Sequence, residues 1–264
     1  MALPVTRYGQ EELFAGKEID PEGESTLEAL AVAPNFNRWM FETIRPYCTG
    51  PVLEVGSGIG NLSAFLLDGG HETYLSDLRP RYCQRLREAF SRHPGCRGVS
   101  QLDLVHPEFG RAYSPLLARF GTVLALNVVE HIADDRGAIS NCRRLLRPGG
   151  HLIILVPAYP FLYNRFDREL GHYRRYTRAA LSRLLAVNGL EVVRSFYFNL
   201  AGMLGWFVSG GLQKNRVIPR GQVALYNRLV WLFRILDRLT WRRLGLSVVA
   251  VGRTSEGERV AAAA

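Results

Sequence analysis

The chain is poor in cysteine, and its cysteines lie far apart. Its 264 residues contain four, Cys48, Cys83, Cys96 and Cys142, with no C-x-x-C pair and no histidine at metal-ligand spacing. Disulfide scaffolds need a much higher cysteine content, and zinc sites need closely spaced ligands. The sequence therefore predicts neither, and it fits the reducing environment of the cytoplasm.

A recognisable targeting or membrane-spanning segment is also lacking. Residues 1–16 contain no basic stretch followed by an apolar core, so we expect no secretory signal. Residues 195–213 are uncharged and reach the lower length of a span, but four glycines and Asn199 interrupt them. Because their first part also has the pattern of a strand, we predict no span and a cytoplasmic chain.

One short segment, residues 51–63 with the sequence PVLEVGSGIGNLS, combines a strand, a glycine turn and a helix start. Its first residues are typical of a strand buried on both faces. Gly56, Gly58 and Gly60 follow, where a side chain would block the turn or a ligand lying against the backbone. Asn61 then begins a predicted helix, whose free amide groups favour an electron-rich ligand.

The glycine spacing separates two ligand classes. A dinucleotide fingerprint, G-x-G-x-x-G, has its third glycine one residue later than this chain does. The arrangement E-x-G-x-G-x-G, which begins at Glu54, resembles the first motif of the class I S-adenosylmethionine (SAM) dependent methyltransferases. Asp77 and Asp103 each follow a later apolar segment, and residues 145–158, LLRPGGHLIILVPA, look like the fifth strand typical of that family. The resemblance covers residues 50–200.

The resemblance implies that SAM is the cofactor and S-adenosylhomocysteine its product. In the family the first loop wraps the methionine and ribose of SAM, an acid after the second strand binds the ribose hydroxyls, and a polar residue after the third faces the adenine amine. The resemblance therefore assigns the ribose hydroxyls to Asp77 and the adenine amine to Asp103. The implied cofactor-binding residues are Glu54, Gly56, Ser57, Gly58, Gly60, Asn61, Asp77, Leu78, Asp103, Leu104 and Asn127.

The alternation of apolar segments and helical patterns predicts an α/β fold. We expect a Rossmann-like, doubly wound and mostly parallel seven-stranded sheet, with a helical N-terminal cap and a helical insertion before the last strand. The expected division is a cap over residues 1–50, a SAM-binding domain over 51–254 and a disordered tail over 255–264. Within the cap, an amphipathic helix over 35–47 either covers the cofactor or packs on the sheet edge through Trp39.

The first insertion, residues 159–176, follows the fifth strand and is rich in aromatic and charged side chains. In the family this loop commonly shapes the pocket of the methyl acceptor, and loops on a rigid scaffold often carry function. The alternative is a solvated connector held by ion pairs. The candidate acceptor-binding residues are Tyr159, Tyr163, Tyr173, Arg175 and Tyr176.

The second insertion, residues 200–245, holds most of the net charge of +9, with eight basic residues and one acidic residue. Within it, residues 223–243 predict a helix with a leucine stripe, Leu225, Leu229, Leu232, Leu236 and Leu239, flanked by arginines. Such a helix can lie on a membrane surface, cover the pocket as a lid, form a homodimer face or dock onto the protein itself. Peripheral contact with the inner membrane face is therefore one reading of this insertion.

Nucleic acid is not an expected partner despite the positive charge. Enzymes that methylate amino groups of nucleic acids carry an Asn/Asp-Pro-Pro-aromatic run after the fourth strand, where this chain reads NVVEHI. Pyrimidine C5 methylation needs a nucleophilic cysteine, commonly in Pro-Cys, and no Pro-Cys occurs. We expect a small-molecule acceptor instead.

Two histidines are placed to act as a catalytic base. His131 follows the fourth strand, and His172 lies in the aromatic insertion. A base that removes the hydroxyl proton of an acceptor raises its nucleophilicity, and histidine suits neutral pH. A surface or supporting role is the alternative for each histidine.

The same region raises the question of a metal. The run N-V-V-E-H resembles the E-x-x-E-H of quinone-pathway O-methyltransferases, whose carboxylates and histidine can hold a divalent ion. Here Asn127 replaces the first acid, which lowers the affinity for a hard cation. We therefore predict no metal site, and we expect Glu130 to cap or pack near the cofactor.

The function expected from these features is methyl transfer from SAM by in-line displacement, as in natural product biosynthesis. The expected acceptor is an oxygen of a small, largely apolar metabolite, such as a polyketide, a quinone or a lipid-like molecule. Nitrogen or carbon methylation is the first alternative. The second is a protein of the same fold that binds SAM without transferring its methyl group or that acts at a membrane surface.

Overall fold

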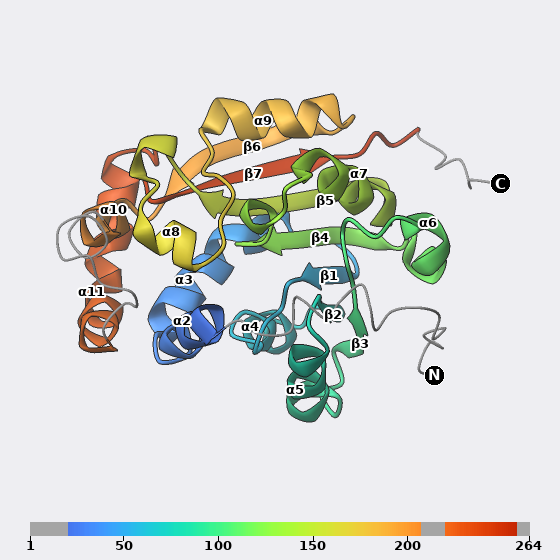
Figure 1. Ribbon diagram of the computed structural model, residues 1–264, viewed down its shortest axis with the longest axis horizontal. Helices are drawn as coiled ribbons and strands as arrows, with labels where there is room; N and C mark the ends of the chain where they lie inside the picture. Colours follow the sequence, from blue (N-terminus) through green and yellow to red (C-terminus); the bar gives the residue numbers. More distant parts are fainter. Residues whose placement is uncertain (1–20, 207–219, 258–264) are drawn as a thin grey trace.

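The apolar segments of the sequence form a seven-stranded sheet in the computed structural model, which describes residues 21–206 and 220–257 (Figure 1). The strands are β1 Val52–Val55, β2 Thr73–Asp77, β3 Cys96–Gln101, β4 Phe120–Leu126, β5 Leu146–Pro157, β6 Glu191–Phe198 and β7 Ser247–Arg253.

The strand order is β3-β2-β1-β4-β5-β7-β6. Strands β1 to β5 pair in parallel, whereas β7 runs antiparallel to both β5 and β6. The order reverses between β1 and β4, and in open α/β sheets ligands bind outside the carboxyl ends of the strands at such a point. The Rossmann-like, mostly parallel sheet expected from the sequence is confirmed.

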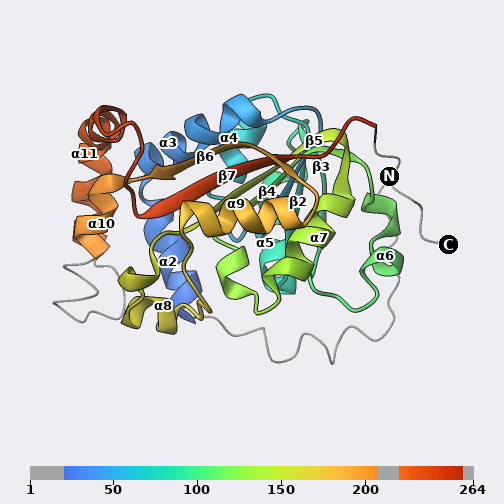
Figure 2. The ribbon, with the colours of Figure 1, turned by 90° about the horizontal axis from the view of Figure 1, so that it is seen from above.

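Helices cover both faces of the sheet (Figure 2). Proline begins several of them, including α3 and α5, where its fixed φ suits the first helical position. The helices are α2 Pro21–Ala31, α3 Pro34–Ile44, α4 Ser63–Asp68, α5 Pro80–Phe90, α6 Phe109–Ala112, α7 Asp135–Leu145, α8 Arg165–Glu169, α9 Arg178–Val187, α10 Leu200–Trp206 and α11 Arg220–Leu239. Single 3₁₀ turns are η2 Arg45–Tyr47, η3 Ser114–Leu116, η4 Val129–His131 and η5 Pro160–Leu162.

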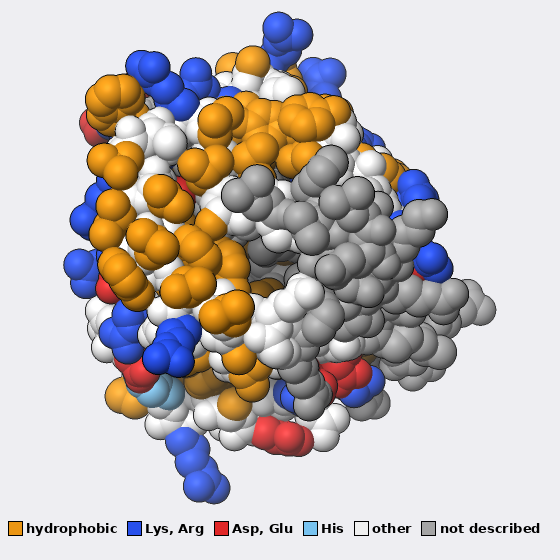
Figure 3. Space-filling model, turned by 90° about the vertical axis from the view of Figure 1, so that its left-hand side faces the viewer, with side chains coloured by type: hydrophobic (Ala, Val, Ile, Leu, Met, Phe, Trp, Pro, Cys, Tyr) orange, Lys and Arg blue, Asp and Glu red, His pale blue; other side chains and the backbone are white. Residues whose placement is uncertain are grey.

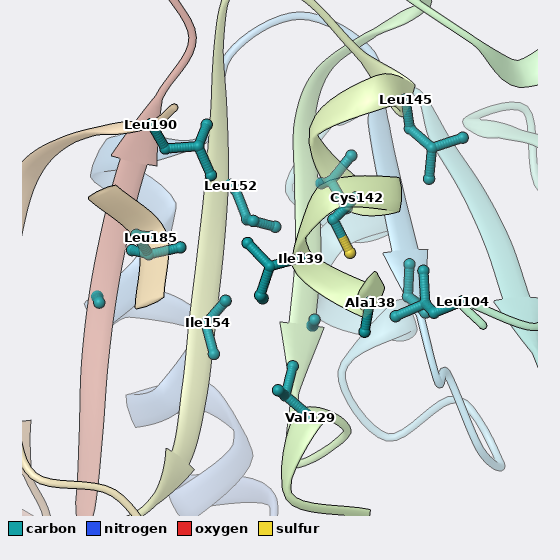
Figure 4. Close-up of a cluster of buried hydrophobic side chains, with 14 of the residues drawn as sticks. Leu104, Val129, Ala138, Ile139, Cys142, Leu145, Leu152, Ile154, Leu185 and Leu190 are labelled. Atoms are coloured by element: carbon teal, nitrogen blue, oxygen red, sulfur yellow. The ribbon is translucent and has the colours of Figure 1, made fainter. Parts of the chain in front are cut away.

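One face of the sheet packs against α7 and α9. Ile139 and Cys142 of α7 lie against the β5 side chains Leu152 and Ile154, and Leu185 of α9 belongs to the same buried cluster (Figure 4). The strands at the centre of the sheet are buried on both faces, which is why they read as continuous apolar runs rather than as alternating patterns. This packing fixes β4 and β5, whose carboxyl ends carry the candidate site.

The opposite face packs against α3, α4 and α11. Trp39 of α3 is buried, and its ring centroid lies 4.4 Å from that of Phe198 at the end of β6. Of the two roles weighed for Trp39, the structure shows packing against the sheet. Residues 1–20 of the expected cap lie outside the described residues.

Helix α11 packs through a different stripe from the one that the leucines predict. Val223, Val230 and Asp237 are buried, whereas Leu225 is 60 % exposed and Leu239 is 69 % exposed. The expected leucine stripe therefore lies largely on the outer side of the helix. Of the expected tail, residues 258–264 lie outside the described residues.

Candidate cofactor and acceptor site

The glycine turn follows β1 at the point where the strand order reverses. Gly56 and Gly58 have φ values of +71° and +55°, in the left-handed region that favours glycine. A Cβ atom on Gly56 would lie 2.5 Å from Cγ2 of Val128, so the turn after β1 and the turn after β4 approach too closely for a side chain. The helix that follows begins at Ser63, two residues later than expected, and leaves Asn61 in the turn.

Glu54 lies inside β1 and is buried. Its Oε2 accepts a hydrogen bond of 2.5 Å from the hydroxyl of Ser63 at the start of α4. Burial raises the pKa of Glu54 to about 7. The first acid of the motif therefore ties the strand to the following helix.

Asp77 ends β2, and its buried carboxylate holds the glycine turn in place. Its Oδ2 accepts the backbone N–H of Gly58 at 2.9 Å, and its Oδ1 accepts that of Arg79 at 2.9 Å. Burial raises its pKa. A carboxylate has about four lone-pair sites, so these two bonds leave acceptor capacity for ligand hydroxyls. The acid expected at the ribose thus also fixes the loop expected at the methionine.

Asp103 and Asn127 follow β3 and β4 at the same edge of the sheet. Asp103 is buried, its Oδ1 accepts the backbone N–H of Val105 at 3.0 Å, and its own N–H donates to the hydroxyl of Tyr113 at 2.9 Å. Asn127 has φ +54° and is exposed beside the glycine turn. Of the neighbouring residues assigned to the cofactor, Ser57 and Leu104 are buried, and Leu78 is half-buried.

Helix α2 covers the glycine turn from the N-terminal side. The side chain of Leu27 is the nearest neighbour of Gly58, and Nδ2 of Asn61 donates to the carbonyl of Leu27 at 2.8 Å. At the start of α2, Glu24 pairs with Arg85 of α5 at 3.0 Å. The sequence predicts a cap but does not identify α2 as the segment that contacts the glycine turn. The contacts between α2 and the turn join residues that are far apart in the sequence, so no local pattern indicates them.

The other half of the site holds a buried network of charged groups. Asp167 of α8 is fully buried, and its Oδ1 accepts Nε of Arg175 at 2.7 Å and Nδ1 of His172 at 2.9 Å. Arg175 also donates to the carbonyl of Ala158 at the end of β5 and lies over the ring of Trp206. These partners lower the pKa of Asp167 against the opposing effect of burial, so it is ionised and Nδ1 of His172 carries the proton.

His172 also meets the turn after β4. Its ring centroid lies 4.6 Å from that of His131, edge to face. Glu130 is fully buried, neither of its carboxyl oxygens has a hydrogen-bond partner among the described residues, and burial raises its pKa to about 8. The structure therefore brings together both candidate bases and a buried acid whose pKa is raised.

These three residues also have the composition of a small cation site. One potential donor atom from each of Glu130, His131 and His172 lies within 4.8 Å of the other two. A carboxylate and two imidazoles are ligands that zinc and related ions accept. The sequence analysis, which predicts no metal, misses this grouping because His172 lies in a different segment from the other two.

The candidate acceptor residues divide into two groups. Tyr163, Tyr173 and Arg175 line an open pocket of about 360 Å³, together with Pro160 and Arg174. The ring of Tyr159 instead stacks on that of Tyr197, with centroids 4.8 Å apart. Tyr176 is buried, and its hydroxyl donates to Asp135 at 2.8 Å. The structure places Tyr159 and Tyr176 beside the core rather than in this pocket.

Asp167 and Trp206 are the residues that the sequence analysis did not single out. Asp167 lies five positions before His172, in a run of mixed charges that looks solvated. Asp167 is buried because α8 packs beside the end of β5, and no local sequence pattern indicates this packing. The capping box, in which Asn164 and Asp167 exchange hydrogen bonds, was the one local signal for the start of α8.

Comparison with known proteins fits this geometry. A family model described as a methyltransferase domain matches residues 25–195. The chain belongs to the SAM-dependent methyltransferases. SAM is therefore its cofactor, and the Rossmann-like sheet is the fold of that family.

Two curated relatives and one solved structure illustrate the similarity. The chain is 27 % identical over 179 residues to a probable SAM-dependent methyltransferase of Mycolicibacterium smegmatis, which covers 64 % of this chain and 65 % of that protein. It is 27 % identical over 155 residues to the highly reducing polyketide synthase stpks1 of Strobilurus tenacellus, covering 56 % of this chain and 5 % of the synthase. The chain thus spans a small part of that relative.

The solved structure is phosphoethanolamine N-methyltransferase 2 of Haemonchus contortus in complex with SAM. It aligns with a TM-score of 0.61 at 13 % identity, covering 96 % of this chain and 61 % of that one. At this identity the alignment shows a shared fold.

Proposed function

We propose that this methyltransferase transfers the methyl group of SAM to a hydroxyl oxygen of a small, largely apolar metabolite. The observation that carries the proposal is the pair Asp167 and His172, buried beside a tyrosine-lined pocket at the carboxyl edge of the sheet. The similarity to a polyketide synthase adds support for a polyketide-like acceptor, although a quinone or lipid-like acceptor has the same chemistry.

His172 is the base in this proposal. Because Nδ1 donates to the ionised Asp167, the neutral imidazole keeps its lone pair on Nε2. That nitrogen accepts the hydroxyl proton of the acceptor, and the carboxylate of Asp167 stabilises the resulting imidazolium. His131, which is exposed and packs edge to face on His172, orients the ring of that base.

The remaining residues bind and position the two reactants. When bound, SAM supplies a methyl group on a positively charged sulfur, and displacement by the acceptor oxygen leaves S-adenosylhomocysteine. Asp77 holds the glycine turn and Glu54 ties β1 to α4, and these segments would hold the cofactor, while Tyr163 and Tyr173 line the acceptor pocket. Positioning two reactants beside each other accounts for a large part of the acceleration in such reactions.

The test uses SAM carrying a ¹³C-labelled methyl group. The protein is incubated with labelled SAM and a metabolite extract, and the chemical shift of the transferred methyl carbon is measured. We expect the shift of a methyl bonded to oxygen. A methyl bonded to nitrogen or carbon would replace the proposal by the alternative reaction, and no transfer by a protein that binds SAM would indicate a non-catalytic role.

Variants of the two histidines then assign the base. His172→Ala is expected to lower kcat by about a hundredfold or more, which is the usual contribution of a general base. His131→Ala is expected to lower kcat by less than tenfold, because His131 only orients the base. Equal losses in the two variants would contradict this assignment.

A further inference from the structure

Helix α11 is held to the protein by polar and apolar groups on its inner side. Oδ1 of Asn227 accepts the backbone N–H of Asn35 at 2.8 Å at the start of α3, and Arg234 pairs with Glu42 at 2.7 Å. Asp237 is buried and accepts the backbone N–H groups of Asn199 and Leu200 at 2.7 and 2.8 Å. These contacts fix the rotation of the helix and therefore determine which residues face outward.

The outward side is unusually apolar. Five large hydrophobic residues on α11 are exposed, and the two largest exposed fractions among them are 63 % for Trp231 and 69 % for Leu239. Trp241, just beyond the helix, is 76 % exposed. Figure 3 shows hydrophobic side chains gathered over the end of the molecule where α10 and α11 lie. We call this the α11 outer face: Leu225, Trp231, Leu232, Ile235, Leu239 and Trp241.

The charges on this face have one sign. Arg228, Arg238 and Arg243 are exposed and lie among or next to its apolar side chains. The only acidic residue between positions 220 and 246 is Asp237, which is buried on the inner side. An apolar helix face with arginines, on a helix that exposes no acid of its own, complements a layer of lipid acyl chains beneath anionic headgroups.

We propose that the α11 outer face binds the surface of a membrane that contains anionic phospholipid. The helix lies in the plane of the interface, with Trp231 and Trp241 at the headgroup level and the arginines against lipid phosphates. None of the helices in residues 21–206 and 220–257 is long and apolar enough to cross a membrane, so the contact is peripheral.

A second copy of the chain is the rival occupant, and the charges disfavour it. A two-fold dimer places the same patch of each copy against itself. Arg228 and Arg238 of the two copies would then approach one another across an apolar contact in which α11 exposes no acid to pair with them. Like charges brought together in this way oppose association.

The test is co-sedimentation of the full chain with lipid vesicles. Vesicles of phosphatidylcholine alone are compared with vesicles containing about 30 % phosphatidylglycerol, at low and high salt. The wild type is expected to bind the anionic vesicles, less at high salt, and the neutral vesicles at least tenfold more weakly. Failure to bind anionic vesicles at low salt would overturn the proposal.

Variants locate the contact. Leu239→Glu and the double variant Arg228→Glu/Arg238→Glu are each expected to reduce vesicle binding at least tenfold. The controls are Val187→Glu and Arg183→Glu, which place an acid at exposed apolar and basic positions of α9 on the opposite face of the sheet, and they are expected to bind as the wild type does. Circular dichroism is used to check that all four variants fold.

Two further outcomes would contradict the proposal. In one, Leu239→Glu binds vesicles as well as the wild type does. In the other, light scattering shows a wild-type dimer that Leu239→Glu separates, and neither form binds vesicles. The second outcome would assign the α11 outer face to another copy of the chain.

Discussion

The two halves of the site are built in different ways. On the cofactor side, Glu54 accepts a hydrogen bond from the hydroxyl of Ser63 at the start of α4, and Asp77 accepts one from the backbone N–H of Gly58 in the glycine turn. Each acid therefore organises the segment beside it. On the acceptor side, Asp167 joins His172 and Arg175 in a buried network that also meets the turn after β4. The first arrangement follows from the pairing of β1 with β2, which brings the ends of these strands together, and the second from how α8 packs.

This contrast explains which half serves which purpose. The glycine turn is held through a backbone N–H group, so the geometry of the turn does not depend on the acceptor. Such a turn suits a ligand that every member of a family shares. A network carried by an insertion can change without disturbing that loop. We therefore propose that residues 159–176 determine the acceptor and its chemistry, while residues 54–104 bind the cofactor.

The largest expected change in stability concerns the anchor of α11 in the second insertion, residues 200–245. Asp237→Ala leaves the N–H groups of Asn199 and Leu200 unpaired in a buried setting and is expected to cost about 4 kcal/mol of unfolding free energy. The measurement is urea denaturation. As a control, Asp134→Ala removes an exposed cap of α7 and is expected to cost about 1 kcal/mol. Equal costs would mean that Asp237 does not anchor α11.

On the cofactor side, the expected change is in pH dependence. The pKa of Glu54 is raised from 4.5 to about 7, so the folded state binds the proton more tightly than the unfolded state. The contribution of Glu54 to the unfolding free energy should therefore fall by about 3 kcal/mol as the pH rises from 4.5 to 7 and then level off. Glu54→Gln should remove this contribution from the pH profile and leave that of the other buried acids, whereas the exposed control Glu72→Gln should follow the wild-type profile. An unchanged profile in Glu54→Gln would contradict the assignment.

A third variant tests the network that positions the base. Asp167→Asn keeps an acceptor for Nδ1 of His172 but removes the charge that stabilises the imidazolium, so kcat should fall about a hundredfold. Because the cofactor loop is separate, KM for SAM should stay within twofold of its wild-type value. A rise in the KM for SAM as large as the fall in kcat would show instead that Asp167 supports the whole fold. Asp135→Asn, at the ion pair with Arg174, is the control.

The smallest expected effect is that of a chelator. In the proposed mechanism His172 acts as a base without an ion, so removal of divalent cations should leave the rate of methyl transfer unchanged. The measurement is transfer before and after dialysis against EDTA. A loss of rate that zinc or magnesium restores would instead place an ion at Glu130, His131 and His172.

Much of the fold was predictable because its signals are local. Apolar runs gave the strands, and the spacing from Glu54 to Gly60 indicated the cofactor before any contact was known. The start of α4 was misplaced because Asn61 resembles a helix cap, whereas its side chain bonds to Leu27 of α2. That contact joins segments 34 residues apart, so no local pattern could report it.

The rest of the site depended on packing. Tyr159 and Tyr176 look like pocket residues by composition, but their rings lie beside Tyr197 and Asp135. The leucine stripe of α11 is equally ambiguous. Hydrophobic periodicity shows that one side of a helix is apolar, but it does not show whether that side faces the protein core or the solvent. Asn227 and Asp237, polar residues on the other side, decide the rotation of the helix.

The separation of the two halves is tested most directly by calorimetric titration of SAM into three proteins. The account predicts that Asp77→Ala binds SAM at least about tenfold more weakly than the wild type, because it loses a charge-assisted hydrogen-bond acceptor. It predicts that His172→Ala binds SAM with the wild-type Kd. Wild-type affinity in Asp77→Ala, or an equal loss in both variants, would contradict it.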